Sequence, residues 1–278
     1  VRVSKPNVAL LWDEPTSSYS AGNTRFVIER QFDYPVTAIR VATLSRADLS
    51  RYHVLIMPEA YPGYGTALDE DIVAKLKDWV ERGGVLIGIG NAGRFLSDPD
   101  VDLTSVRREN TVVADNGDES AVQVEDGEES EEPTVSGSYV AGADDYQALI
   151  TAEKGGPDSV AGILAKANVD PDHWLGAGVS PTLNVLVRGP DIYTPIRLDK
   201  GVNVAVFEAA DELLASGYMW EQNRKQLAYK PFAVVQPTGR GFVIGFTQDP
   251  NVRAYLDGLN VIFMNAIFWG AAHARPVR

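Results

Sequence analysis

Acidic and amide side chains follow several apolar runs of this sequence, at the points where buried strands would end. They are Asp13, Glu14, Glu59, Asn91 and Asp249. The carboxyl ends of parallel strands share one edge of a sheet, so these side chains could converge on a crevice. Paired carboxylates perform acid–base chemistry, but the same residue types also cap helices and satisfy loop amides. Two carboxylates and an amide there would favour a cation or a polyhydroxylated ligand over an anion.

The turn after the apolar run Val85–Ile89 has the strand–turn–helix pattern that enzymes use to present a reactive Ser or Cys. Here the turn reads Gly90, Asn91, Ala92 and Gly93, with neither a thiol nor a hydroxyl. Because the chain contains no cysteine at all, thiolate catalysis is excluded. Nucleotide binding is disfavoured as well, since no GxGxxG motif follows the first strand and no GKS or GKT occurs.

The three histidines do not form a metal-binding pattern. His53, His173 and His273 lie far apart in the sequence, and none belongs to an HExxH or HxxE pair. We therefore expect no zinc site and no cofactor in this chain. His173 is retained as a weaker candidate for a functional residue because it lies in a turn rich in proline and aspartate.

The charge of the chain is concentrated in one segment. The net charge is −13, yet 13 acidic residues and no Lys or Arg lie between Glu109 and Glu153, so the rest of the sequence is balanced. No block of basic residues is present, which disfavours a nucleic-acid partner. We expect a solvated, flexible loop there; a calcium site at 115–118 is the alternative, although it lacks the later ligands of an EF-hand loop. No apolar run is long enough to span a membrane.

The ordered parts of the sequence alternate between strand and helix patterns. Continuously apolar runs are typical of parallel strands covered on both faces, and Asp69–Arg82 has helical periodicity. This alternation predicts a three-layer, flavodoxin-like α/β sandwich with additional β segments near the C-terminus. The predicted strands are 7–12, 36–41, 53–58, 85–89, 160–166, 182–187, 202–208, 232–235 and 242–246; the predicted helices are 23–32, 69–82, 144–153 and 258–270.

We expect a single domain over residues 1–278. An acidic, flexible insertion is predicted at 98–138, where the hydrophobic periodicity is lost and Gly, Ser, Asp and Glu are frequent. The sequence starts at Val1 rather than at Met, which is typical of a fragment or a processed form.

Several ordered stretches resemble the class I glutamine amidotransferase-like fold. They include Val54–Glu59, Leu76–Gly84 with the strand and turn that follow, and Gly239–Phe246. More narrowly, they resemble the amidotransferase-like domain that follows the peptidase domain in some bacterial zinc carboxypeptidases. The stretches Asp172–Val179 and Ala215–Tyr218 look like short motifs of that subgroup.

The resemblance also implies where a catalytic triad would lie. The Cys position of true amidotransferases falls at Gly90 or Asn91, the His at Thr247 and the Glu at Asp249. The nucleophile and the base are both replaced, so glutaminase activity is not expected. We therefore expect no catalytic residues and a vestigial pocket formed by Glu59, Gly90, Asn91, Thr247 and Asp249, with Asp13, Glu14 and His173 as weaker candidates.

The resemblance implies a non-catalytic accessory domain of a bacterial zinc carboxypeptidase-like protein. Its partner would be a peptidase domain upstream of Val1, zinc would be bound only there, and the protein would be periplasmic or secreted. Binding, positioning and homo-oligomerisation are the roles left open. The alternative is a stand-alone enzyme, or a domain for sugars or other small polar ligands, that uses the carboxylates at the strand ends.

Overall fold

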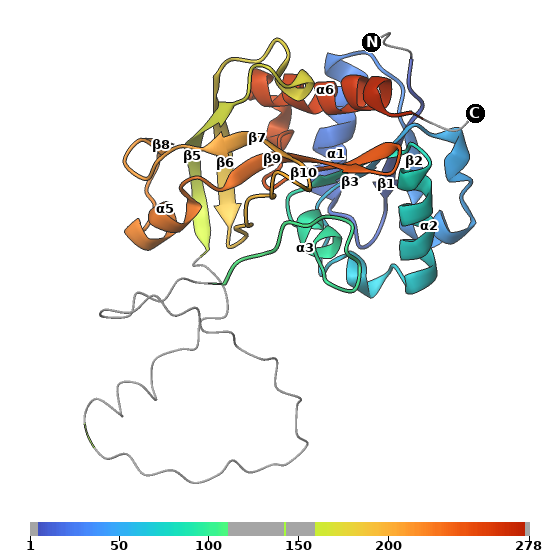
Figure 1. Ribbon diagram of the computed structural model, residues 1–278, viewed down its shortest axis with the longest axis horizontal. Helices are drawn as coiled ribbons and strands as arrows, with labels where there is room; N and C mark the ends of the chain where they lie inside the picture. Colours follow the sequence, from blue (N-terminus) through green and yellow to red (C-terminus); the bar gives the residue numbers. More distant parts are fainter. Residues whose placement is uncertain (1–4, 111–141, 143–158, 276–278) are drawn as a thin grey trace.

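The computed structural model describes residues 5–110, 142 and 159–275, which form one large mixed sheet with helices on its faces (Figure 1). The strands run in the order β2-β1-β3-β4-β10-β9-β7-β5-β6, and β8 pairs with β5. The strands are β1 (Val8–Trp12), β2 (Thr37–Arg40), β3 (Val54–Met57), β4 (Val85–Ile89), β5 (Val160–Val169), β6 (Thr182–Gly189), β7 (Val202–Phe207), β8 (Leu214–Ser216), β9 (Pro231–Thr238) and β10 (Gly241–Phe246).

The sheet has a parallel half and an antiparallel half, which meet between β10 and β9. Strands β2, β1, β3, β4 and β10 are parallel, whereas β9, β7, β5 and β6 pair antiparallel with their neighbours. The parallel half has the strand order of a flavodoxin-like sheet. The predicted α/β sandwich with additional β segments is confirmed.

Helices cover both faces of the parallel half because its strands are apolar on both sides. Leu10 and Ile56 belong to a core that includes residues of α6, whereas Leu11 and Leu55 belong to a core on the opposite face that includes residues of α2 and α3. The helices are α1 (Ser18–Phe26), α2 (Glu70–Glu81), α3 (Ala92–Leu96), α5 (Glu221–Leu227) and α6 (Asp257–His273), and short helical turns are η1 (Val27–Gln31), η2 (Val41–Arg46), η3 (Leu49–Arg51), η4 (Tyr64–Thr66), η5 (Trp174–Gly176) and η6 (Val252–Ala254).

Local sequence signals explain where several helices begin and end. Asp69 caps α2 by accepting a hydrogen bond from the Ile72 amide at 2.9 Å, and Gly83, with φ at +114°, follows its end. The helix predicted at 23–32 begins earlier, at Ser18, and continues as a π-helical turn at Val27–Gln31. The sequence patterns also missed β8 and α5, which are too short for a periodicity to stand out.

The C-terminal helix α6 is apolar around most of its circumference because it packs on the sheet. Leu259, Ile262 and Phe263 are at most 1% exposed. Within the described residues, no helix combines the length and apolar character that a membrane crossing requires.

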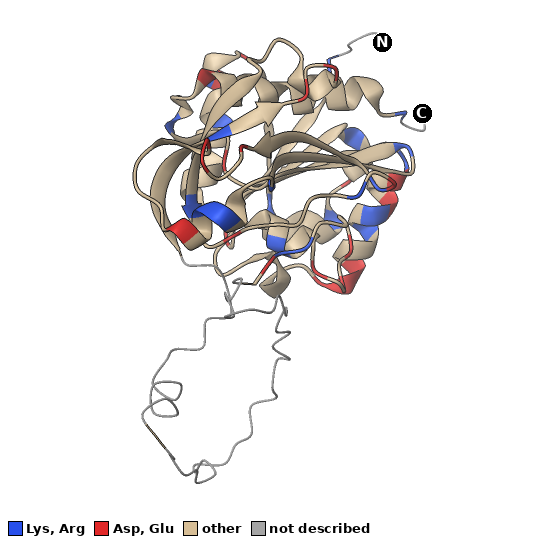
Figure 2. Ribbon diagram, turned by 60° about the vertical axis from the view of Figure 1, so that its left-hand side comes forward, with Lys and Arg blue, Asp and Glu red and all other residues tan. Residues whose placement is uncertain are grey.

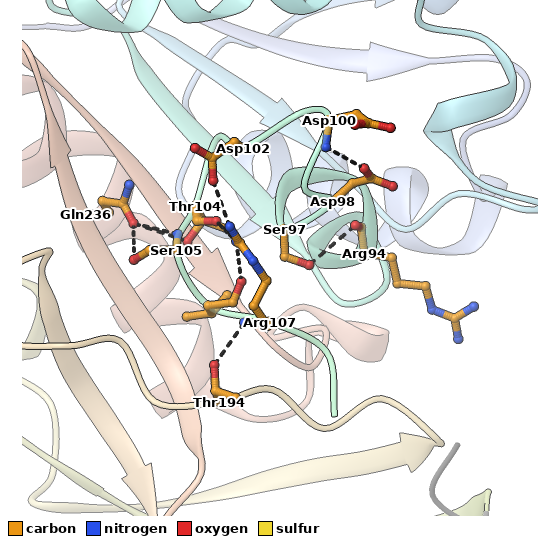
Figure 3. A network of polar contacts seen from close by, with 11 residues as sticks. Arg94, Ser97, Asp98, Asp100, Asp102, Thr104, Ser105, Arg107, Thr194 and Gln236 are labelled. Atoms are coloured by element: carbon orange, nitrogen blue, oxygen red, sulfur yellow. Dashed lines mark hydrogen bonds and ion pairs between the residues drawn. The ribbon is translucent and has the colours of Figure 1, made fainter. Parts of the chain in front are cut away.

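Residues 97–108 form a strap that starts beside α2 and α3, where Val101 and Leu103 are buried, and then lies against the antiparallel half. Gln236 Oε1 on β9 accepts hydrogen bonds from the amide and hydroxyl of Ser105, and the Arg107 amide donates to Thr194 Oγ1 (Figure 3). Val106 is buried against Val234 of β9. The first part of the predicted insertion is therefore packed on the domain. The rest of it, at 111–138, the calcium alternative at 115–118 and the predicted helix 144–153 lie outside the described residues.

Candidate functional site at the carboxyl edge of the sheet

The parallel strands end in register, which brings the residues after them together. Met57 of β3 pairs with Gly88 of β4, and Ile89 pairs with Phe246 of β10. Glu59 and Gly90 are therefore the residues that leave the sheet next to one another. We call this side of the sheet the carboxyl edge, and it is where open α/β sheets place their ligands.

Gly90 and Glu59 are in close contact at this edge. Gly90 has φ at +56°, a left-handed conformation, and its amide donates to the Phe246 carbonyl at 2.8 Å. A Cβ atom built on Gly90 would lie 2.5 Å from Glu59 Oε1. The Glu59 carboxylate therefore occupies the space that a side chain at residue 90 would need.

Glu59 is a buried carboxylate with one cationic partner. Its side chain is 9% exposed, and Oε2 lies 2.8 Å from Nη2 of Arg188, a residue of β6 in the antiparallel half. Burial, together with the negative charge of Asp249, raises the pKa of Glu59 to about 7, and the Arg188 guanidinium opposes this shift. Glu59 can therefore exchange a proton near neutral pH.

Asp249 lies close to Glu59 and is joined to it through Ser20 of α1. Asp249 Oδ2 accepts a hydrogen bond from Ser20 Oγ at 2.8 Å, and the same oxygen of Ser20 accepts one from the Glu59 amide at 3.2 Å. Asp249 Oδ1 accepts from the Asn251 amide. Burial raises the pKa of Asp249, whereas these hydrogen bonds lower it. Asp249 thus fixes the loop after β10 to the start of α1.

Asn91 joins the same edge, but its side chain is used by the backbone. Its Oδ1 accepts from the Ala60 amide and its Nδ2 donates to the Ala60 carbonyl, both at 2.8 Å. This pair of hydrogen bonds fastens the turn after β4 to the loop after β3. Asn91 therefore positions Glu59 rather than offering its amide to a ligand.

Replacing Asn91 is accordingly expected to destabilise the fold. Asn91→Ala removes both hydrogen bonds to Ala60 and should lower the free energy of unfolding by about 2 kcal/mol, since each such bond contributes roughly 1 kcal/mol. Urea denaturation measures the change. Asn184→Ala, on the exposed side of β6, is the matched control and should change stability by less than about 0.5 kcal/mol. Equal stability of the two variants would contradict the bridging role of Asn91.

The remaining sequence candidates lie outside this cluster. The Thr247 hydroxyl is buried and donates to the Pro231 carbonyl, so it ties the end of β10 to β9. Asp13 pairs with Arg40 at the surface, and Glu14 is exposed. His173 caps η5 by accepting from the Leu175 amide.

His173 also lies at the opposite edge of the sheet. Its ring contacts Trp174, which in turn contacts Phe242, the residue that pairs with Val85 at the start of β4. His173 therefore lies near the amino ends of the parallel strands. Burial lowers the pKa of His173.

The structure adds residues that the sequence patterns did not indicate. The Asp191 side chain is 9% exposed and forms ion pairs with Arg94 of α3 at 2.9 Å and with Arg108 of the strap at 2.8 Å. Arg188 reaches Glu59 from the end of β6, shortly before Asp191. Arg94 and Arg108 lie far from Asp191 in the sequence, as Arg188 does from Glu59, and only the fold brings these partners together. No local motif could have identified them.

A hollow lies beside this cluster rather than over Glu59. It has a volume of about 630 Å³ and is bounded by the loop after β3, by α2 and by α3. Asn91 and Arg94 form its border with the cluster. Across residues 5–110, 142 and 159–275, no group of three His, Asp or Glu side chains is arranged to hold a metal ion.

Solved structures of other proteins share this architecture. A ThuA-like protein from Parabacteroides merdae superimposes with a TM-score of 0.56 at 13% identity, over 99% of this chain and 93% of that one. A protein from Thermoplasma acidophilum that is described as part of a GMP synthase gives 0.54 at 10% identity, over 96% of both chains. The fold is that of the class I glutamine amidotransferases. No protein-family model matches the sequence, and no curated protein matches it.

The amidotransferase-like fold also occurs within a larger solved chain. A β-galactosidase from Bacillus circulans matches 98% of this chain with a TM-score of 0.50 at 12% identity, but only 32% of that protein is covered. At these identities the likeness concerns the fold alone. Within this fold, the turn that the resemblance assigns to the nucleophile carries Gly90, with Glu59 beside it.

Proposed function

We propose that this chain is a non-catalytic amidotransferase-like domain that binds a small polar ligand at the carboxyl edge. The observation that carries the proposal is the close approach of Glu59 to Gly90. A nucleophilic side chain at residue 90 would collide with the Glu59 carboxylate, 2.5 Å from its Cβ. Covalent acyl transfer needs a nucleophile and a base within hydrogen-bond reach, and neither is present at the positions that the resemblance assigns to them.

We further propose that the domain serves as an accessory to a zinc carboxypeptidase-like peptidase domain in the same polypeptide. The sequence resemblance in Asp172–Val179 and Ala215–Tyr218 supports this context. The match to one third of a β-galactosidase adds a precedent for the fold as part of a larger chain. The coding sequence upstream of Val1 tests this proposal, which requires an HxxE zinc motif there. A preceding sequence without that motif would refute it.

Activity and ligand assays on the purified chain test the first proposal. We expect no release of ammonia from glutamine. We also expect one class of compound in a panel of sugars, acetylated amino acids and metal ions to raise the melting temperature, because a ligand at 100 Kd adds about 2.7 kcal/mol of stability. Ammonia release that Glu59→Gln abolishes would show that the site is catalytic. A panel in which no compound raises the melting temperature would contradict the binding role.

One observation favours a second function, that of a stand-alone enzyme using acid–base chemistry. A buried carboxyl whose pKa is raised to about 7, as in Glu59, is suited to proton transfer at neutral pH. If the chain is such an enzyme, turnover of a glycoside or ester substrate would be lost in Glu59→Gln. It would be retained in Arg197→Gln, which alters an exposed arginine that pairs with Asp199.

A further inference from the structure

Three arginines from three separate segments surround the two buried carboxylates at the carboxyl edge. Arg94 and Arg108 both contact Oδ1 of Asp191, and Arg188 contacts Glu59. We call Arg94, Arg108 and Arg188 the arginine rim. Elsewhere, acidic and basic residues are interspersed, as on α2 (Figure 2).

The arginine rim keeps donors available to solvent. The side chains of Arg94, Arg108 and Arg188 are 42%, 37% and 45% exposed, whereas the carboxylates they contact are 9% exposed. Arg94 and Arg108 use Nε for Asp191, and within the described residues their Nη groups donate no hydrogen bond. In Figure 3 the Arg94 side chain points away from the polar network of the strap. Guanidinium Nη groups that are exposed and donate no other hydrogen bond are suited to bind a further anion.

The charges of the cluster balance when every group is ionised and leave one cation in excess when Glu59 is protonated. Three guanidinium groups face the carboxylates of Asp191, Glu59 and Asp249, so the cluster matches a singly charged anion better than a phosphate dianion once Glu59 holds a proton. The expectation of a cation or a polyhydroxylated ligand rested on Glu59, Asn91 and Asp249 alone. The exposed Nη groups of the arginine rim add donors for an anion to that set.

We propose that the arginine rim binds the carboxylate group of a small organic anion. The inference rests on the proposed function, because it names the ligand class of the same edge. Tyr61, whose side chain lies near these charges and is 63% exposed, offers an aromatic face for the organic part of the ligand. The buried Tyr193 hydroxyl lies beside Gly93 and has no hydrogen-bond partner within the described residues.

Binding of the carboxylate should be coupled to a proton on Glu59. The charged groups that influence Glu59 are Asp249, Asp191 and Arg188, and protonation of Glu59 removes one negative charge from the cluster. An added anion therefore binds more tightly when Glu59 is neutral. We expect affinity to rise as the pH falls from 8 to 6, and this dependence to disappear in Glu59→Gln.

Nuclear magnetic resonance of the arginine Nε–H groups tests the proposal directly. The probes are N-acetylglycine, inorganic phosphate and glucose, each titrated into the whole chain. We expect N-acetylglycine alone to give saturable shifts of the Arg94, Arg108 and Arg188 signals. Saturable shifts with phosphate instead of N-acetylglycine would overturn the carboxylate assignment. Saturable shifts with glucose instead of N-acetylglycine would overturn the inference but leave the proposed small-ligand site standing. If none of the three probes shifts these signals, both the inference and the proposed site are overturned.

The decisive variant is Arg108→Gln, because Asp191 keeps Arg94 as its partner. It should weaken N-acetylglycine at least about tenfold, since it removes a charge-assisted pair of donors. Arg108→Lys should recover part of that loss, because it restores the charge without the planar fork. Arg197→Gln, at an exposed arginine that pairs with Asp199, is the control for loss of one surface charge and should bind as the unmodified chain does. Unchanged affinity in Arg108→Gln, with a native amide spectrum, would refute the proposal.

Discussion

Gly90→Ala is expected to lower the free energy of unfolding by about 2–5 kcal/mol, because two effects combine. The positive φ of +56° disfavours any residue with a Cβ atom by roughly 1–2 kcal/mol. The new methyl group would also lie 2.5 Å from Glu59 Oε1, and forcing an atom into occupied space typically costs about 1–3 kcal/mol. Urea denaturation measures the sum.

Two controls separate these effects. Gly178→Ala has a similar positive φ, +72°, but nothing within 4 Å of its new Cβ, so it should lose only the backbone contribution of roughly 1–2 kcal/mol. Glu59→Ala combined with Gly90→Ala removes the collision, and the pair should be less destabilising than the sum of its single changes. Additive losses would mean that Glu59 does not occupy the space beside Gly90.

The second large effect is a dependence of the free energy of unfolding on pH that arises from the titration of Glu59. Its pKa is raised from 4.5 to about 7 in the folded chain, so between these values the folded state binds more protons than the unfolded state. The contribution to stability is present in full below pH 4.5 and is lost as the pH rises to about 7. A shift of this size corresponds to about 3 kcal/mol.

The comparison with Glu59→Gln isolates this contribution. The unmodified chain should lose about 3 kcal/mol relative to the variant between about pH 4.5 and 8, because glutamine does not titrate. Unfolding in urea at several pH values provides the measurement. Parallel stability curves for the two proteins would show that Glu59 has an ordinary pKa in the fold.

Much of the parallel half could be predicted because its signals are local. The run Val85–Ile89 is apolar throughout, as a strand covered on both faces must be, and it matches β4 in both bounds. Asp69 and Gly83 similarly mark the ends of α2. The clustering of Glu59, Gly90 and Asp249 follows from topology, since all three leave the carboxyl ends of parallel strands.

The rest of the site depends on contacts that leave no trace in a short stretch of sequence. Arg108 and Asp191 meet only because the strap crosses the antiparallel half. Each is an ordinary charged residue in its own surroundings, and surface charges carry no periodicity. The roles of Asn91 and Thr247 were hidden for a similar reason, because each of them hydrogen-bonds backbone groups of a neighbouring segment. Residue type alone does not reveal whether an amide or a hydroxyl is already engaged.

The place of β10 in the sheet has a consequence for folding during synthesis. Strand β10 pairs with β4, although about 150 residues of chain separate them. At the usual rate of about 5–20 residues per second, the free side of β4 would wait roughly 8–30 seconds for its neighbour to leave the ribosome. The N-terminal half therefore cannot complete its sheet as it emerges, and such distant pairing is typical of slow folding with high contact order. Until β10 is synthesised, the unpaired edge of β4 is open to pairing with other chains, which is a route to aggregation.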